Sequence, residues 1–166
     1  MIDRIKLFCC TGGVGLLPKA PGTWGSLFPL IILLALGHFG ASQLVNTISL
    51  LAIVVLSSLV TITLAPWYTN YFGKQDPSQV VCDEWAGQSI ALLGMAWLVP
   101  ATHVSPETWI GLAIVSFVLF RLFDIWKPAF IGISEKLSGG WGVLIDDILA
   151  GIAAGILVFI TAVILS

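Results

Sequence analysis

Long apolar stretches separated by short polar pieces dominate the pattern of this sequence. A helix that crosses a bilayer needs about 20 apolar residues. Three stretches meet that length, at 44–65, 109–130 and 143–165. Two more, 24–39 and 84–99, are shorter and could be short tilted spans or re-entrant hairpins. The pattern predicts an all-α, polytopic membrane helix bundle with about five membrane-inserted helices.

The composition supports insertion into a membrane. Of the 166 residues, 58% are hydrophobic and 10% are charged, and the mean hydropathy is +1.03. A soluble domain of this size would need more polar residues to cover its surface, whereas a lipid-facing surface needs none. The net charge is −2 and no basic cluster is present, so we expect no nucleic-acid partner. Because no repeat or domain boundary is visible, we expect residues 1–166 to form a single domain.

The positive charges favour one orientation of the spans. If all five segments cross, every Lys and Arg falls on or near one side, and the opposite loops, around 37–43 and 100–108, hold none. The positive-inside rule places the charged side in the cytoplasm. The N-terminus is then expected inside and the C-terminus outside. The positive residues are Arg4, Lys6, Lys19, Lys74, Arg121, Lys127 and Lys136.

Six acidic residues come out on or near the same side, and Glu107 faces the other way. Small residues at 151, 154 and 155 share a helical face with Asp147, so we expect its carboxylate to point into the bundle. The simplest alternative for an acidic pair in a first helical turn is capping and compensation of the helix dipole, which explains one aspartate more easily than two. The six acids are Asp83, Glu84, Asp124, Glu135, Asp146 and Asp147.

Up to five of these carboxylates, from three helix ends, could converge at one depth. Like charges packed together are unfavourable without a cation, and hard oxygen ligands without clustered Cys or His indicate Mg²⁺, Mn²⁺ or Ca²⁺. We expect Mg²⁺, because it favours a few carboxylates together with waters and substrate phosphate. The expected catalytic and metal-binding residues are Asp83, Glu84, Asp124, Asp146 and Asp147.

Three charges near the inner end of the segment 109–130 are the second part of the expected site. Arg121, Asp124 and Lys127 follow one another at i, i+3 and i+6, which keeps them on one broad helix face. Charges at this depth are costly unless they face protein or a wet cavity. We interpret Arg121 and Lys127 as clamps for a phosphate group. The alternative is an Arg121–Asp124 ion pair that only closes the helix end.

Glycine-containing stretches at 11–26 and 138–142 would let backbone N–H groups approach an anion, although turns at a membrane edge explain each of them about as well. Thr23 and Ser26 are the candidate phosphate-binding residues of the first stretch. Both histidines fall in the outer loops, no cysteine is followed by an arginine six residues later, and no D-x-D pair is present. Metal-assisted attack by water is the mechanism that remains.

Four sequence blocks carry a family resemblance: PGTWGS at 21–26, CDEWAG at 82–87, FRLFDIWKP at 120–128 and GGWGVLIDDILAG at 139–151. In this order and at these separations they closely resemble the phosphatidylglycerophosphatase A family, over nearly the whole chain. The resemblance implies a small bacterial inner-membrane protein, with its active site at the cytoplasmic face. It also implies one integral-membrane phosphatase domain that removes phosphate from phosphatidylglycerophosphate, with Mg²⁺, to give phosphatidylglycerol. Matched by position, the family's functional residues fall on Asp83, Glu84, Arg121, Asp124, Lys127, Asp146 and Asp147.

Three other classes remain open. Intramembrane carboxylates also occur in ion or proton transporters, although here they gather at one face and no charge sits at mid-membrane. Another membrane phospholipid-headgroup enzyme could use the same metal chemistry, but the spaced aspartates expected of a phosphatidyl transferase are missing. A purely structural membrane subunit would not need this group of charges. The expected partners are the lipid substrate and the bilayer, and the sequence does not predict an oligomeric state.

Overall fold

All regular structure in the described part of the chain is helical. The computed structural model describes residues 2–97, 105–127 and 139–165. Predictions for His103, Glu135 and Lys136 therefore lie outside the described residues. The elements are α1 (Ile2–Thr11), the 3₁₀ turn η1 (Val14–Leu16), α2 (Pro21–His38), α3 (Gln43–Thr63), α4 (Ala65–Phe72), α5 (Cys82–Ala96), α6 (Pro106–Trp126) and α7 (Gly140–Leu165).

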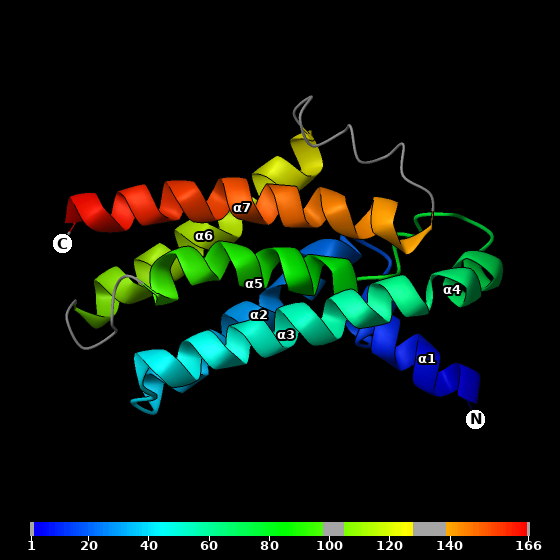
Figure 1. Ribbon diagram of the computed structural model, residues 1–166, viewed down its shortest axis with the longest axis horizontal. Helices are drawn as coiled ribbons and strands as arrows, with labels where there is room; N and C mark the ends of the chain where they lie inside the picture. Colours follow the sequence, from blue (N-terminus) through cyan, green and yellow to red (C-terminus); the bar gives the residue numbers. More distant parts are fainter. Residues whose placement is uncertain (1, 98–104, 128–138, 166) are drawn as a thin grey trace.

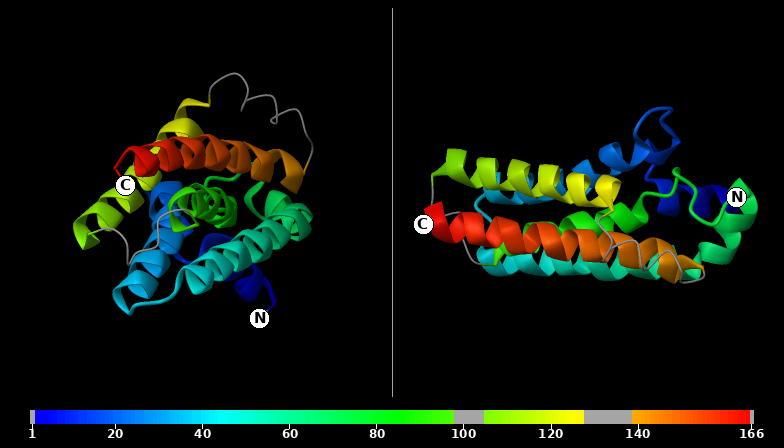
Figure 2. Two further views of the ribbon diagram at one scale, coloured as in Figure 1. Left: turned by 60° about the vertical axis from the view of Figure 1, so that its left-hand side comes forward. Right: turned by 90° about the horizontal axis from the view of Figure 1, so that it is seen from above.

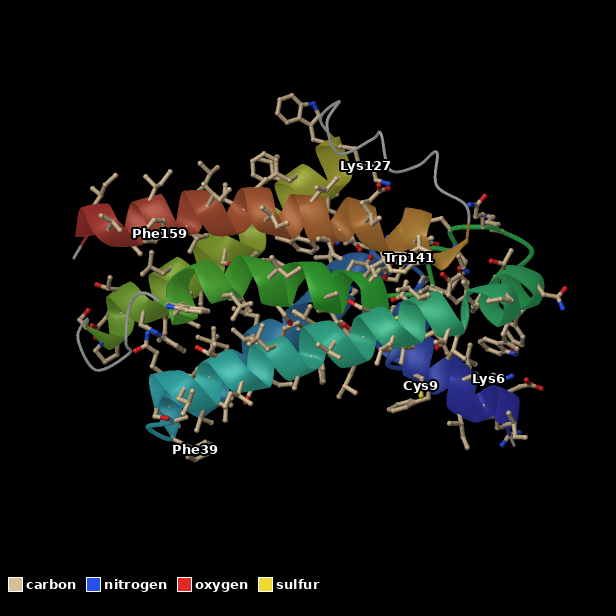
Figure 3. All side chains as sticks on the ribbon, in the orientation of Figure 1. Lys6, Cys9, Phe39, Lys127, Trp141 and Phe159 are labelled. Carbon is tan, nitrogen blue, oxygen red and sulfur yellow. The ribbon has the colours of Figure 1, made fainter. Side chains whose placement is uncertain are left out.

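Five of these helices form a bundle, and α5 lies in its middle (Figure 1). α5 packs against α2, α3, α6 and α7. The five helices alternate in direction along the chain, so the starts of α2, α5 and α7 and the end of α6 lie together. Asp83, Asp124 and Asp147 line one cavity at this end, which we call the acidic end. It also carries α1 and α4 (Figures 1 and 2). Lys127 is at the acidic end, and Phe39 is at the opposite end (Figure 3).

The helices confirm the predicted all-α membrane bundle. α2, α3, α6 and α7 are long and apolar enough to cross a membrane. α5 has 15 residues, which at a rise of 1.5 Å per residue makes it about 22 Å long, shorter than a hydrocarbon core of about 30 Å. The described residues of the two short predicted stretches lie in single continuous helices, α2 and α5, up to His38 and Ala96, so the hairpin alternative does not hold for them.

Side-chain caps and prolines explain several helix starts. Ser42 accepts a hydrogen bond from the Val45 N–H before α3, and Ser105 accepts one from the Thr108 N–H before α6. Such caps satisfy N–H groups that have no partner inside the helix. Pro21 and Pro106 stand at the start of α2 and α6, where a missing N–H costs nothing.

Glycines allow α5 and α7 to pack backbone to backbone. A Cβ on Gly151 would overlap the carbonyl oxygen of Gly87, and one on Gly94 would overlap the carbonyl oxygen of Gly155. Small residues permit this close approach of helices in a membrane. The predicted small-residue face of α7 is confirmed, and Asp147, on the same face, is 4% exposed.

Two predicted boundaries are wrong, and both concern site residues. α7 begins at Gly140 rather than at 143, so Asp146 and Asp147 lie beyond its first turn, which carries no acidic residue. The capping interpretation of this pair therefore fails. α6 ends at Trp126, because Lys127 adopts a left-handed conformation with φ 42°. Lys127 is thus not on a continuous helix face with Arg121. Its side chain extends to the site from the residue that follows α6.

Candidate active site

All five predicted carboxylates line one cavity of about 250 Å³ at the acidic end. It lies where α2, α5 and α7 begin and α6 ends (Figure 1). Two larger hollows, of about 630 Å³ beside α4 and about 310 Å³ at the opposite end, contain none of the predicted site residues. The cavity is lined by the charged residues Asp76, Asp83, Glu84, Arg121, Asp124, Lys127, Asp146 and Asp147, and by Ala20, Pro21, Gly22, Ser78, Val80 and Val143.

Three of the carboxylates form a group that could bind a metal ion. Asp83, Glu84 and Asp147 each offer one oxygen, and these oxygens lie within 4.8 Å of one another. Asp83 and Asp147 are buried, and Glu84 Oε2 is buried with no hydrogen-bond partner among the described residues. Buried carboxylates packed this closely repel one another unless a proton or a cation intervenes. Oxygen donors alone, one of them without a partner, fit a hard divalent cation.

Arg121 faces this group from α6. Its Nη1 lies 2.7 Å from Asp124 Oδ2 and 3.9 Å from Glu84 Oε1, and donates a hydrogen bond to Ser26 Oγ at 3.3 Å. The Arg121 side chain is 14% exposed. The ion pair named as the alternative to a phosphate clamp is therefore present, and it lies in the cavity wall. Asp124 is the partner of Arg121 rather than a member of the three-carboxylate group.

Lys127 reaches the cavity from beyond the end of α6 and binds Asp146. The distance from Lys127 Nζ to Asp146 Oδ2 is 2.8 Å, and Asp146 is 5% exposed. The structure thus divides the five predicted carboxylates into two kinds. Three face one another, and the other two lie 2.7 Å and 2.8 Å from a positive side chain, whereas Glu84 of the first group is 3.9 Å from Arg121. Metal ligation by all five stays a prediction, and the geometry gives it most support at Asp83, Glu84 and Asp147.

The first turn of α2 forms one wall of the cavity. A Cβ on Gly22 would overlap Glu84 Oε1 and would lie 3.2 Å from Arg121 Nη1, so only glycine lets this turn come so close. Ser26 is fully buried and donates to the Gly22 carbonyl oxygen at 2.7 Å while it accepts from Arg121. Ser26 therefore lies behind Arg121, and neither Ser26 nor Thr23 lines the cavity. Direct phosphate binding by these two residues stays a prediction.

The sequence reasoning missed Asp76, Ser78 and Gly22 as cavity residues. Asp76 and Ser78 belong to the loop between α4 and α5. A signal for Asp76 was present, because the same charge distribution that grouped the other acids places this loop on their side. No comparable signal marks Gly22, whose importance depends on the approach of Glu84 from another helix.

Tyr68 on α4 lies near the cavity but is not placed for proton transfer. Burial, with a smaller contribution from the negative charge of Asp83, raises the pKa of Tyr68 above its usual value. Its hydroxyl donates to the Thr61 carbonyl oxygen at 3.1 Å. The phenol therefore stays protonated and fastens α4 to α3.

Comparison with known proteins agrees with the family resemblance of the sequence. A family model described as Phosphatidylglycerophosphatase A matches residues 7–162. The chain belongs to this family. Phosphatidylglycerophosphatase A of Haemophilus influenzae is 36% identical over 160 residues, which are 96% of this chain and 89% of that protein. Phosphatidylglycerophosphatase A of Escherichia coli is 35% identical over 152 residues, 89% of this chain and 78% of that protein.

A third relative has a similar sequence identity but a different name. A Bacteroides thetaiotaomicron protein, provisionally named phosphatidylinositol-3-phosphatase, is 38% identical over 146 residues, 88% of this chain and 86% of that protein. No solved structure matches the chain significantly. Membership of the phosphatidylglycerophosphatase A family makes this membrane protein a phosphatase, a hydrolase of phospholipid metabolism.

Proposed function

We propose that this phosphatase hydrolyses the phosphate monoester of phosphatidylglycerophosphate to phosphatidylglycerol and inorganic phosphate, with Mg²⁺ as its cofactor. Two relatives named phosphatidylglycerophosphatase A support the substrate. The observation that carries the proposal is the cavity itself, in which three clustered carboxylates face a largely buried arginine at one end of a membrane bundle. The whole chain, 1–166, would act as one integral-membrane phosphatase domain.

Asp83, Glu84 and Asp147 would hold the cation. When bound, Mg²⁺ supplies positive charge that polarises the phosphoryl group. Buried oxygens within 4.8 Å of one another support this assignment, as does the unpartnered Oε2 of Glu84. The role of the remaining two carboxylates, Asp124 and Asp146, is different in this proposal, because each already neutralises a positive side chain.

Arg121 and Lys127 would bind the phosphate. A monoester phosphate carries up to two negative charges, so it would compete with Asp124 and Asp146 for these two positive side chains. The planar guanidinium of arginine suits the phosphate oxygens. Once Arg121 turns to the phosphate, Asp124 would be free to accept the proton of the attacking water. The water oxygen would bond to phosphorus as the bond from phosphorus to the glycerol oxygen breaks, and that oxygen would take the proton held by Asp124 and leave as an alcohol.

The active site would face the cytoplasm of a bacterial inner membrane. Every Lys and Arg of the described ranges lies on α1, in the loops that precede α2 and follow α4, or at the acidic end of α6, and the positive-inside rule favours the cytoplasm for this side. The acyl chains of the substrate would then stay in the bilayer while the headgroup enters the cavity. Transport of ions receives no comparable support, because the charges described in the five bundle helices lie near helix ends.

The test is phosphate release by purified protein in detergent. We expect release from phosphatidylglycerophosphate, loss of activity with EDTA and recovery with added Mg²⁺. Phosphatidylinositol 3-phosphate should be a much poorer substrate. Glu107→Gln, at the opposite end of the bundle, is the matched control and should match wild type. If the inositol lipid were hydrolysed faster than phosphatidylglycerophosphate, the proposed substrate would be wrong. Full activity in EDTA would contradict the proposal that Mg²⁺ is the cofactor.

A further inference from the structure

α1 presents an apolar face that no other described element covers. Ile2, Ile5 and Phe8 are 66%, 57% and 68% exposed. They stand at i, i+3 and i+6, which places them on one side of the helix. α1 extends from the bundle at the acidic end, beside α4 (Figure 1). A short helix with three large exposed apolar side chains in one row needs an apolar environment along that row.

Basic and aromatic groups accompany this face. Arg4 is exposed, and Lys6 Nζ lies 5.8 Å from the centre of the Trp67 ring on α4, which is within cation–π range. The one acidic residue of α1, Asp3, accepts a hydrogen bond from Trp67 Nε1 at 2.9 Å. Tyr71 stacks on Trp67 and is 55% exposed. Aromatic residues of this kind are enriched where a protein meets the headgroup layer of a membrane.

We propose that α1 lies in the headgroup layer of the bilayer leaflet at the acidic end, with its apolar face against the acyl chains and its basic residues on anionic lipid phosphates. Helices that combine an apolar face with Lys and Arg bind anionic membrane surfaces in this way. A second copy of the chain is a less suitable occupant. Two α1 helices paired through this face would bring Arg4 and Lys6 near their counterparts, which repel them.

The placement of α1 would also set the depth of the active site. The carbonyl oxygen of Cys10 accepts a hydrogen bond from Val81 N–H at 2.8 Å, and Cys10 is fully buried. Val81 directly precedes α5, whose first turn carries Asp83 and Glu84. A helix fixed at the lipid surface is thereby joined to the carboxylates, so the cavity would stay at the level of lipid headgroups.

Spin labels on α1 test the proposal without use of enzyme activity. In a Cys9→Ser background, where Cys10 and Cys82 are buried, a nitroxide is attached at Phe8→Cys or at Arg4→Cys. The full chain is reconstituted in vesicles of phosphatidylcholine mixed with phosphatidylglycerol. At position 8 we expect collisions with oxygen to exceed those with a water-soluble nickel complex, and the reverse at position 4. Equal exposure to the nickel complex at both positions would overturn the proposal.

Two further measurements distinguish lipid from a second copy of the chain as the partner of the apolar face of α1. Strong spin–spin broadening at position 8 would show that a second copy covers it and would overturn the lipid assignment. In vesicles of phosphatidylcholine alone, the preference for oxygen at position 8 should shrink. Arg4→Gln with Lys6→Gln should abolish this lipid dependence, whereas Lys19→Gln with Lys74→Gln, which removes the same number of positive charges outside α1, should leave it. An unchanged lipid dependence in the double variant would contradict the binding of anionic lipid by Arg4 and Lys6. This outcome does not depend on which substrate the enzyme hydrolyses.

Discussion

Replacement of Arg121 distinguishes its two roles, phosphate clamp and structural ion pair. The guanidinium lies 2.7 Å from Asp124, and the two side chains are 14% and 13% exposed. If the pair served stability alone, removal of one partner would leave a largely buried charge, which costs about 3–5 kcal/mol. Removal of both would restore most of that stability, and lysine would replace arginine with little loss.

The clamp makes a different prediction for turnover. A donor aimed at charge that develops in the transition state is worth about 100- to 1000-fold in rate. Arg121→Lys keeps the positive charge but loses the two-pronged geometry of the guanidinium. We therefore expect turnover to fall by most of this factor while the protein stays folded. Asp124→Asn combined with Arg121→Gln should be folded and inactive.

The assay measures phosphate release and thermal unfolding on the same detergent preparations of the single and double variants. Recovery of stability without recovery of turnover in the double variant is the expected result. Turnover near wild type in the double variant would refute the clamp and leave the ion pair as the sole role of Arg121. Near-normal turnover of Arg121→Lys would refute the need for the arginine fork.

Two other predictions concern packing and orientation. Gly151→Ala should lower the unfolding temperature, because its Cβ would overlap the Gly87 carbonyl oxygen and overpacking costs about 1–3 kcal/mol; Gly111→Ala, in open space, is the control and should not lower it. In a cysteine-labelling scan, His103→Cys should react from the periplasm and Asp76→Cys only after permeabilisation, whereas reaction of both from one side would contradict five crossings.

Hydrophobic pattern and charge predicted most of the fold. The five apolar stretches correspond to the five bundle helices, because a lipid-facing helix must be apolar over most of its length whatever its neighbours are. The helix ends were harder to predict. α7 begins directly after Gly139, which has φ 69°, and α6 ends directly before Lys127, which has φ 42°, and no long apolar run marks either place. α4 was missed, since its eight residues lie in a stretch that reads as a polar connection.

The candidate site was predictable in membership but not in arrangement. One-sided charge grouped the acids, and the structure brings all of the predicted carboxylates to one cavity. Sequence spacing indicated the Arg121–Asp124 ion pair as an alternative, but it could not show that Lys127, at the end of α6, pairs with Asp146 on α7. The position of Ser26 behind Arg121 depends on how α2 packs against α6, which sequence spacing does not determine.

A Mg²⁺ titration of phosphate release tests most directly whether the three clustered carboxylates hold a catalytic cation. Wild type and Glu107→Gln should follow the same saturating curve. Asp147→Asn removes a ligand charge with little change in volume. It should shift half-maximal activity to at least about tenfold higher Mg²⁺ or abolish activity, since loss of even an outer partner costs about 10- to 100-fold. Superimposable curves for Asp147→Asn and wild type, in rate and midpoint, would contradict the assignment of the cavity as the metal-dependent active site.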